Sequence, residues 1–112
     1  MKESQAADAA VMDVMAEYET SGRDVFGLLM TQRADGRFGR SDALEAWLDD
    51  DRRANLLTAI AKHGEAVAVT ALVIALLARE AADRESEWRP ALTKAHAWLA
   101  AQGTTLDGAT LL

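Results

Sequence analysis

The chain has 112 residues, half of them hydrophobic, which is the length and composition of one globular domain. Its net charge of -6 disfavours nucleic-acid or anionic-lipid binding, because both need clustered basic residues. The absence of cysteine excludes disulfides, thiolate metal sites and cysteine nucleophiles, and it fits a reducing compartment. Because the N-terminus also lacks an apolar signal core, we expect a cytoplasmic protein.

The N-terminal part of the chain predicts two helices in succession. The first should cover about residues 4–20, because apolar residues recur there at helical spacing, and Gly22 suits its end. This apolar stripe consists of Val11, Val14, Met15 and Tyr18. The second helix should begin at a capping box formed by Ser21 and Asp24 and should end near Gln32.

A loop over residues 33–40 follows, and its spacing partly resembles a calcium-binding loop. A calcium loop would begin at Thr31, and its third ligand position would then be Arg33, which brings positive charge to the ion. We therefore interpret the segment as a helix–helix turn. In this interpretation Gly36 adopts a positive φ and Phe38 fills the core.

The middle of the chain predicts two further amphipathic helices. The first should cover residues 42–49 with Ser41 as its cap, and the second residues 52–63 with Asp51 as its cap. Gly64 should end the second helix. The run of three aspartates at 49–51 marks a helix terminus, since adjacent helical residues point about 100° apart and cannot converge on one ion.

Residues 65–82 form the longest apolar helix in the prediction. Their apolar side chains cover nearly the whole circumference, which is typical of a central helix with neighbours on every side. We therefore predict an all-α fold, a compact single-domain bundle of five to six helices around this central helix. At about 13 residues, the apolar run is too short for a membrane span, which needs about 20.

The last predicted helix covers residues 87–102. Ser86 should cap it, and Pro90 should lie in its first turn, where the missing N–H costs nothing. We expect residues 1–103 to form the bundle domain and residues 104–112 to be a loosely held C-terminal tail.

No pattern in the sequence predicts catalysis, a cofactor or a metal site. The two histidines, His63 and His96, are more than thirty residues apart and lack the spacing of metal ligands. Nucleophile motifs and glycine-rich phosphate loops are also missing. We therefore expect a non-enzymatic protein without cofactor or metal.

Three segments follow one another along the chain: a Q-x-x-D-G-x-F hairpin, an alanine- and leucine-rich helix and an E-W-x-x-x-x-x-K-A-x-x-W-L segment. The positions that define them are Gln32, Asp35, Gly36, Phe38, Ala71, Leu72, Glu87, Trp88, Lys94, Ala95, Trp98 and Leu99. This order resembles the C-terminal helical region of proteins that combine a VIT domain with a von Willebrand A domain. The group includes relatives of the inter-alpha-trypsin inhibitor heavy chains and the vault-associated poly(ADP-ribose) polymerase.

The resemblance implies a protein–protein interaction or assembly-targeting module, since a region of this type attaches the polymerase to the major vault protein. Phe38 stands where tryptophan is commoner, and the VIT and von Willebrand A domains are absent from this sequence. The expected partner is another protein of unknown identity, and association of identical chains into a homo-oligomer is a second option. The alternative is an acidic regulatory bundle that binds a small ligand or a basic protein. The expected contact residues are Asp35, Arg37, Phe38, Trp98, Leu111 and Leu112.

Overall fold

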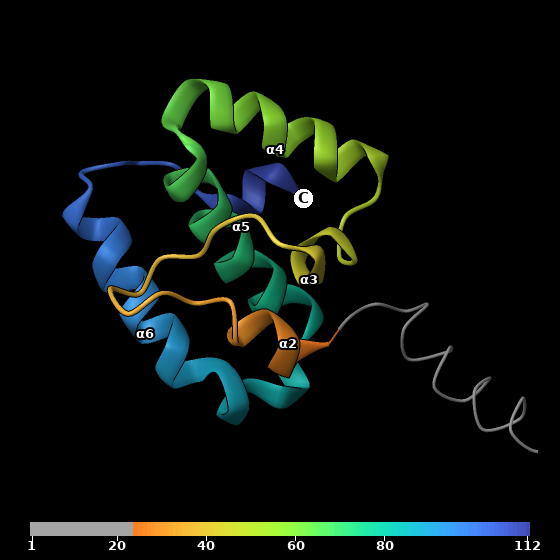
Figure 1. Cartoon of the computed structure of the whole chain (residues 1–112), viewed down its shortest axis with the longest axis vertical. Coiled ribbons are helices and arrows are strands. Elements are labelled where there is room, and N and C mark those ends of the chain that lie inside the picture. The colour runs from red at the N-terminus through yellow and green to blue at the C-terminus, as the bar shows by residue number, and fades with distance from the viewer. Residues whose placement is uncertain (1–23) are drawn as a thin grey trace, which may run out of the picture.

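The computed structural model describes residues 24–112, and all regular structure in that part of the chain is helical (Figure 1). This confirms the predicted all-α bundle. The helix expected over residues 4–20, and Ser21 of the expected capping box, lie outside the described residues. The elements are α2 (Val25–Leu29), α3 (Asp42–Glu45), α4 (Asp50–His63), α5 (Glu65–Glu80), the 3-10 helix η1 (Ala82–Arg84), α6 (Glu85–Ala101) and the 3-10 helix η2 (Gly108–Leu111).

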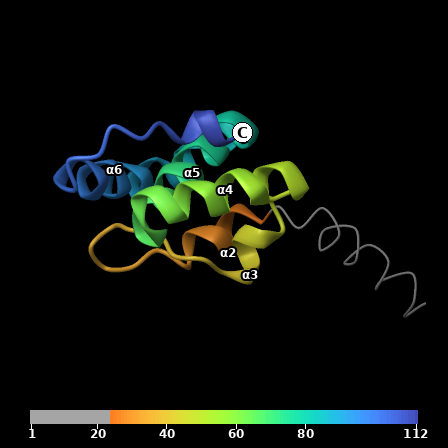
Figure 2. The same cartoon turned by 90° about the horizontal axis from the view of Figure 1, so that it is seen from above.

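Helix α5 is the centre of the bundle, as its apolar sequence predicts. Helices α4 and α6 and the C-terminal η2 all pack on it, and the loop after α2 passes over its other side (Figure 2). The expectation that α5 is enclosed all round is wrong along one strip. Ile74 and Ala75 are only half-buried and Ala78 is exposed, because no element within residues 24–112 covers this part of the helix.

The caps of α3 and α4 satisfy N–H groups that the first helical turn leaves unbonded. The Leu44 N–H donates to Ser41 Oγ at 3.1 Å, which confirms the predicted cap of α3. In α4 the Arg52 N–H donates to Asp49 Oδ1 at 2.8 Å, so the cap is Asp49 and the prediction of Asp51 is wrong. Any of three adjacent aspartates suits a cap chemically, and the path of the chain after α3 decides which of them caps.

Helix α6 begins two residues earlier than the sequence predicts. The short helix η1 leads directly into it, so Ser86 lies inside the first turn and does not cap the helix. Pro90 is consequently the sixth helical residue rather than part of the first turn, and the carbonyl of Ser86 receives no helical hydrogen bond from it.

The Q-x-x-D-G-x-F hairpin after α2 is fastened to α5 and α6 by hydrogen bonds. Gln32 Nε2 donates to the carbonyl of Gly36 at 2.9 Å and to that of Ala91 at 2.7 Å. The N–H of Phe38, whose ring is fully buried, donates to Thr70 Oγ1 at 2.9 Å. Gly36 has φ +106°, and a Cβ there would lie 2.5 Å from the Lys94 carbonyl oxygen. The predicted positive φ and core role are thus confirmed.

The C-terminal segment is not the loosely held tail that the sequence predicts. Gly108 lies directly against the backbone of α5, and Leu111 is buried in the main core. The side chain of Asn55 in α4 donates to the carbonyl of Leu111 at 3.2 Å. Residues 104–112 therefore complete the bundle by covering one side of α5.

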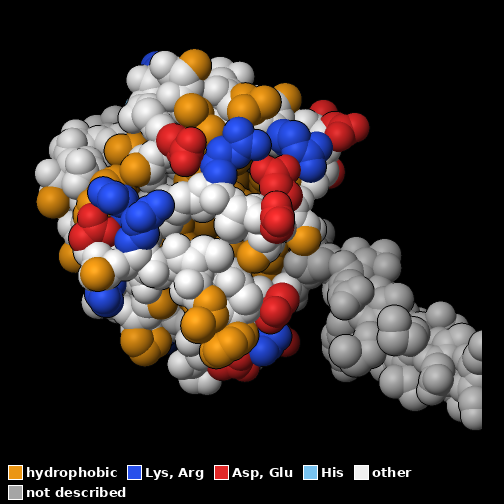
Figure 3. Space-filling model, viewed as in Figure 1, with side chains coloured by type: hydrophobic (Ala, Val, Ile, Leu, Met, Phe, Trp, Pro, Cys, Tyr) orange, Lys and Arg blue, Asp and Glu red, His pale blue; other side chains and the backbone are white. Residues whose placement is uncertain are grey.

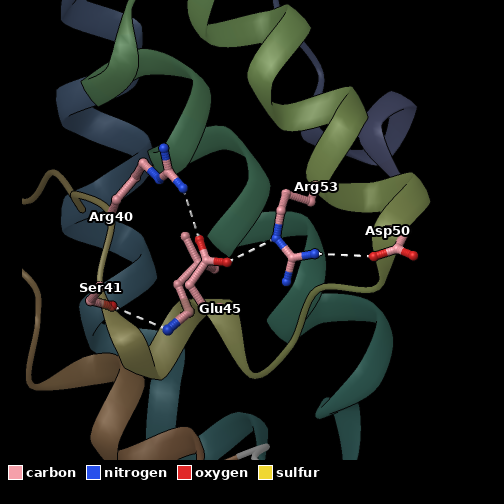
Figure 4. Close-up of polar contacts among 6 residues, drawn as sticks. Arg40, Ser41, Glu45, Asp50 and Arg53 are labelled. Carbon is pink, nitrogen blue, oxygen red and sulfur yellow. Dashed lines mark hydrogen bonds and ion pairs between the residues drawn. The ribbon is translucent and has the colours of Figure 1, made fainter.

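An ion-pair cluster joins α3 to the first turns of α4 (Figure 4). Glu45 accepts from Arg53 Nε at 3.0 Å and from Arg40 Nη2 at 3.1 Å, and Arg53 also pairs with Asp50 at 3.2 Å. Positive and negative side chains consequently lie side by side over α3 and α4 (Figure 3). The hydrogen bond from Arg53, aided by Arg40, holds the pKa of Glu45 below its ordinary value of 4.5 against the opposing effect of burial.

The lowered pKa of Glu45 predicts a pH-dependent contribution to stability. Since the folded-state pKa is lower than the unfolded one, the contribution is complete above about pH 4.5 and is lost as the pH falls through the folded-state pKa. We expect Glu45→Gln to lower the free energy of unfolding by about 0.5–1 kcal/mol at pH 7. Urea denaturation at several pH values should show this difference vanish in acid. A difference that persists there would contradict the assignment.

Candidate functional site

An open groove runs beside α5, where the uncovered strip of this helix forms the floor. One wall is α6 and the other is the C-terminal segment that contains η2. Two hollows make up the groove, with volumes of about 430 and 390 Å³, and Ile74, Ala78 and His96 line both of them. We call this feature the α5–α6 groove.

The floor of the groove is made of apolar side chains, three of them alanines. Ala71, Ile74, Ala75 and Ala78 follow one another at helical spacing along α5 and line the hollow beside η2. On the opposite wall, Trp88 and Leu92 of α6 line the second hollow. The short side chains of Ala75 and Ala78 would allow a polypeptide segment to pack close to α5.

Charged groups lie at the rims of the groove. Arg79 and His96 are exposed and line the hollow beside η2, together with Asp107. On the α6 side Arg89 is already paired with Glu85. Asp107 accepts the Ala109 N–H at 3.0 Å as the cap of η2, whereas Arg79 forms no ion pair with any residue in 24–112.

The structure does not gather the predicted contact residues into one surface. Asp35 and Arg37 pair at 3.2 Å on the exposed hairpin, which lies on the opposite side of α5 and α6 from η2 (Figure 2). Trp98 is half-buried, and Leu112 is half-buried in the wall of the groove.

The prediction that six residues contact a partner is wrong for two of them, because these two are buried. Phe38 is fully buried and Leu111 nearly so, and both belong to the core, where no partner reaches them in the folded domain. The interpretation of the hairpin already places Phe38 in the core, and the structure bears out that role rather than the role of a contact. Leu111 is expected in a loosely held tail, but packing against α5 and its neighbours buries it.

The residues of the groove floor were missed by sequence reasoning. Their spacing was visible, but a helix that is apolar all round gives no sign of which strip its neighbours leave open. The only local signal is that two residues on this strip, Ala75 and Ala78, are smaller than the leucines and valines on the buried faces.

The two buried tryptophans differ in their polar contacts. Trp88 Nε1 donates to the Ala81 carbonyl at 2.8 Å, which ties α6 to the end of α5. Trp47 Nε1 is buried and has no hydrogen-bond partner among residues 24–112. An unpaired buried donor costs stability, so the two indoles contribute differently.

This contrast predicts the effects of two matched substitutions. Trp88→Phe and Trp47→Phe remove the same volume, but only the first breaks a hydrogen bond, after which the Ala81 carbonyl keeps only the bond from the Arg84 N–H. We expect Trp88→Phe to lower the free energy of unfolding by about 1 kcal/mol more than Trp47→Phe does, as measured by urea denaturation. Equal losses of unfolding free energy in the two variants would show that the Trp88 hydrogen bond does not stabilise the fold.

Within residues 24–112 no group of three or more potential ligands is placed to hold a metal ion. No helix in this part of the chain is long and apolar enough to cross a membrane.

Comparison with protein families, with curated proteins and with solved structures finds no match.

Proposed function

We propose that this domain is a non-catalytic attachment module that binds an amphipathic helix of another protein in the α5–α6 groove. The observation that carries the proposal is the uncovered strip of the central helix, with Ile74 and Ala78 shared by two adjoining hollows. The resemblance to the C-terminal region of VIT and von Willebrand A proteins, which implies attachment, agrees with this function.

The dimensions of the groove favour a helical occupant. Its α6 wall extends from Glu85 to His96, which corresponds to roughly 16 Å at 1.5 Å per residue, or three turns of a helix. A helix bound in a groove presents apolar residues at spacings of three and four, and two adjoining hollows would receive two such anchors. The apolar floor would be removed from water on binding, which supplies the driving force.

The rim charges favour an acidic residue beside the apolar stripe of the partner helix. Arg79 has no ion-pair partner among the described residues, and His96 lies on the same hollow. A carboxylate placed between these two groups would gain a charge-assisted hydrogen bond. The expected partner segment is therefore amphipathic and locally acidic.

Site-specific photocrosslinking tests this function directly. A photoreactive amino acid is placed at Ala78 on the floor of the groove or, as a control, at Ala97, which is also exposed but lies outside both hollows. In cells that produce the protein naturally, the Ala78 position should yield one predominant crosslinked protein, and peptide mapping should locate the crosslink in an amphipathic helix. Crosslinks that are the same at both positions, or that occur only at Ala97, would contradict the proposal.

The alternative, a bundle that binds a small ligand, has less support from the geometry. Both hollows are open to solvent along one side, whereas sites for small molecules usually enclose most of the ligand. A rise in melting temperature with a metabolite library, lost in Ala78→Phe, would favour this alternative.

A further inference from the structure

Helix α4 lies at the edge of the bundle, and no other element in residues 24–112 covers its outer side (Figure 1). Ala54, Leu57 and Ala61 are exposed there, at spacings of three and four residues. Residues at these spacings share one side of a helix, so the three side chains form a continuous apolar stripe. Its central member, Leu57, is 47% exposed. We call these three residues the α4 stripe.

Opposite charges flank the two ends of the α4 stripe. Asp51 lies in the first turn of α4 and Lys62 in its last turn, and both side chains are exposed. They are eleven residues apart, close to three full turns, and therefore lie along the same edge of the stripe. Neither forms an ion pair with a residue in 24–112, whereas the neighbouring Asp50 is already paired with Arg53. Both charges are thus available to a partner.

We propose that the α4 stripe packs against the α4 stripe of a second copy of this chain, with the two helices antiparallel. A two-fold axis near Leu57 brings Asp51 of each copy to Lys62 of the other. Ala54 and Ala61 meet across the axis in the same way, because both pairs have their midpoint within one residue of Leu57. The inference is independent of the proposed function, since the stripe shares no residue with the α5–α6 groove.

Charge complementarity identifies a second copy as the occupant. A helix bound on this face needs a cation opposite Asp51 and an anion opposite Lys62, and α4 itself supplies both when it runs in the opposite direction. Each copy carries a net charge of -6, which opposes the approach of two copies. A face on which the two signs complement each other reduces this repulsion at the contact.

The side chains of the stripe also suit a helix pair. The alanines on both sides of Leu57 allow two backbones to approach closely, and Leu57 supplies apolar area at the axis. Helix α4 has 14 residues, which gives a contact roughly 21 Å long. A single helix pair of this length buries less than the roughly 800 Å² per partner of a standard stable interface. We therefore expect a weak dimer that dissociates at micromolar concentrations.

Sedimentation velocity on the full chain tests for this dimer over about 1–500 µM, the range in which a weak interface dissociates. Leu57→Glu brings two carboxylates together at the axis and should weaken the dimer at least about tenfold. The control Ala97→Glu adds the same charge to α6, away from the stripe, and should leave the affinity within about threefold. A monomer at every concentration, or equal affinities of the two variants, would overturn the proposal.

Charge reversal tests the antiparallel register. Asp51→Lys alone places cations opposite each other at both ends of the contact, and Lys62→Asp alone places anions there. Each variant should therefore dimerise about tenfold more weakly than the natural protein. An equimolar mixture of the two variants should regain the natural affinity within about threefold, because each copy then supplies the charge that the other lacks. A mixture that associates no better than either variant would overturn the antiparallel pairing, and a melting curve of each variant shows that it stays folded.

Discussion

Replacing Leu72 by alanine is expected to lower the free energy of unfolding by about 2–5 kcal/mol. Leu72 is fully buried in the middle of α5, the helix on which α4, α6 and η2 pack. The substitution removes apolar contacts and leaves a cavity at the centre of the bundle, where several elements meet and none can collapse without disturbing the others. Small domains have about 5–15 kcal/mol of stability in total, so this loss is a large fraction.

Urea denaturation measures this loss, and Leu57→Ala provides the control. Leu57 is 47% exposed on α4, so its truncation should cost about 1 kcal/mol or less. If Leu72→Ala and Leu57→Ala lowered stability equally, α5 would not be the centre of the core.

The second large effect is expected from Gly108→Ala in η2. A Cβ at this position would lie 1.8 Å from the carbonyl oxygen of Ala71, which is far inside van der Waals contact. Since the atoms of α5 that the new Cβ would meet are all backbone, η2 must move away from α5, and Leu111 must leave the core with it. We expect a loss of about 3 kcal/mol, at the upper end of what overpacking costs.

Hydrogen exchange should locate this effect. In Gly108→Ala the amides of residues 108–112 should lose their protection, whereas Gly39→Ala, which has open space around its Cβ position, should leave the protein unchanged. Undiminished protection of residues 108–112 in Gly108→Ala would mean that η2 does not pack against α5 as closely as the structure shows.

The sequence alone predicts the helical class and the central helix, because both follow from short-range patterns. The apolar run that becomes α5 and the Ser41 cap are read from neighbouring residues. By contrast, the true cap of α4 is Asp49 rather than Asp51, and Ser86 lies inside α6, because these details depend on how the chain enters each helix.

Long-range contacts explain the larger differences. The burial of Gly108 and Leu111 depends on contacts with α5, which lies far earlier in the chain. The sequence near residues 108–112 therefore does not predict this burial. The α5–α6 groove escaped prediction for the same reason, since it exists only where α6 and η2 leave a strip of α5 uncovered.

The motif behind the family resemblance has a structural role in this chain. Gln32 ties the hairpin to α6, Gly36 allows it to approach Lys94, and Phe38 fills the core. These positions therefore specify how the hairpin packs on α5 and α6. Other residues must therefore select the partner, and we propose that these are the residues that line the α5–α6 groove.

The affinity of the crosslinked partner for two charge-matched variants tests the central claim most directly. Ala78→Glu places a carboxylate on the floor of the groove, whereas Ala97→Glu adds the same charge outside it. We expect Ala78→Glu to weaken binding by about a hundredfold or more, since an unpaired charge would be buried in the interface, and Ala97→Glu to leave the affinity within about threefold of the natural protein. Equal affinities for the two variants, with melting temperatures unchanged, would contradict docking in the groove.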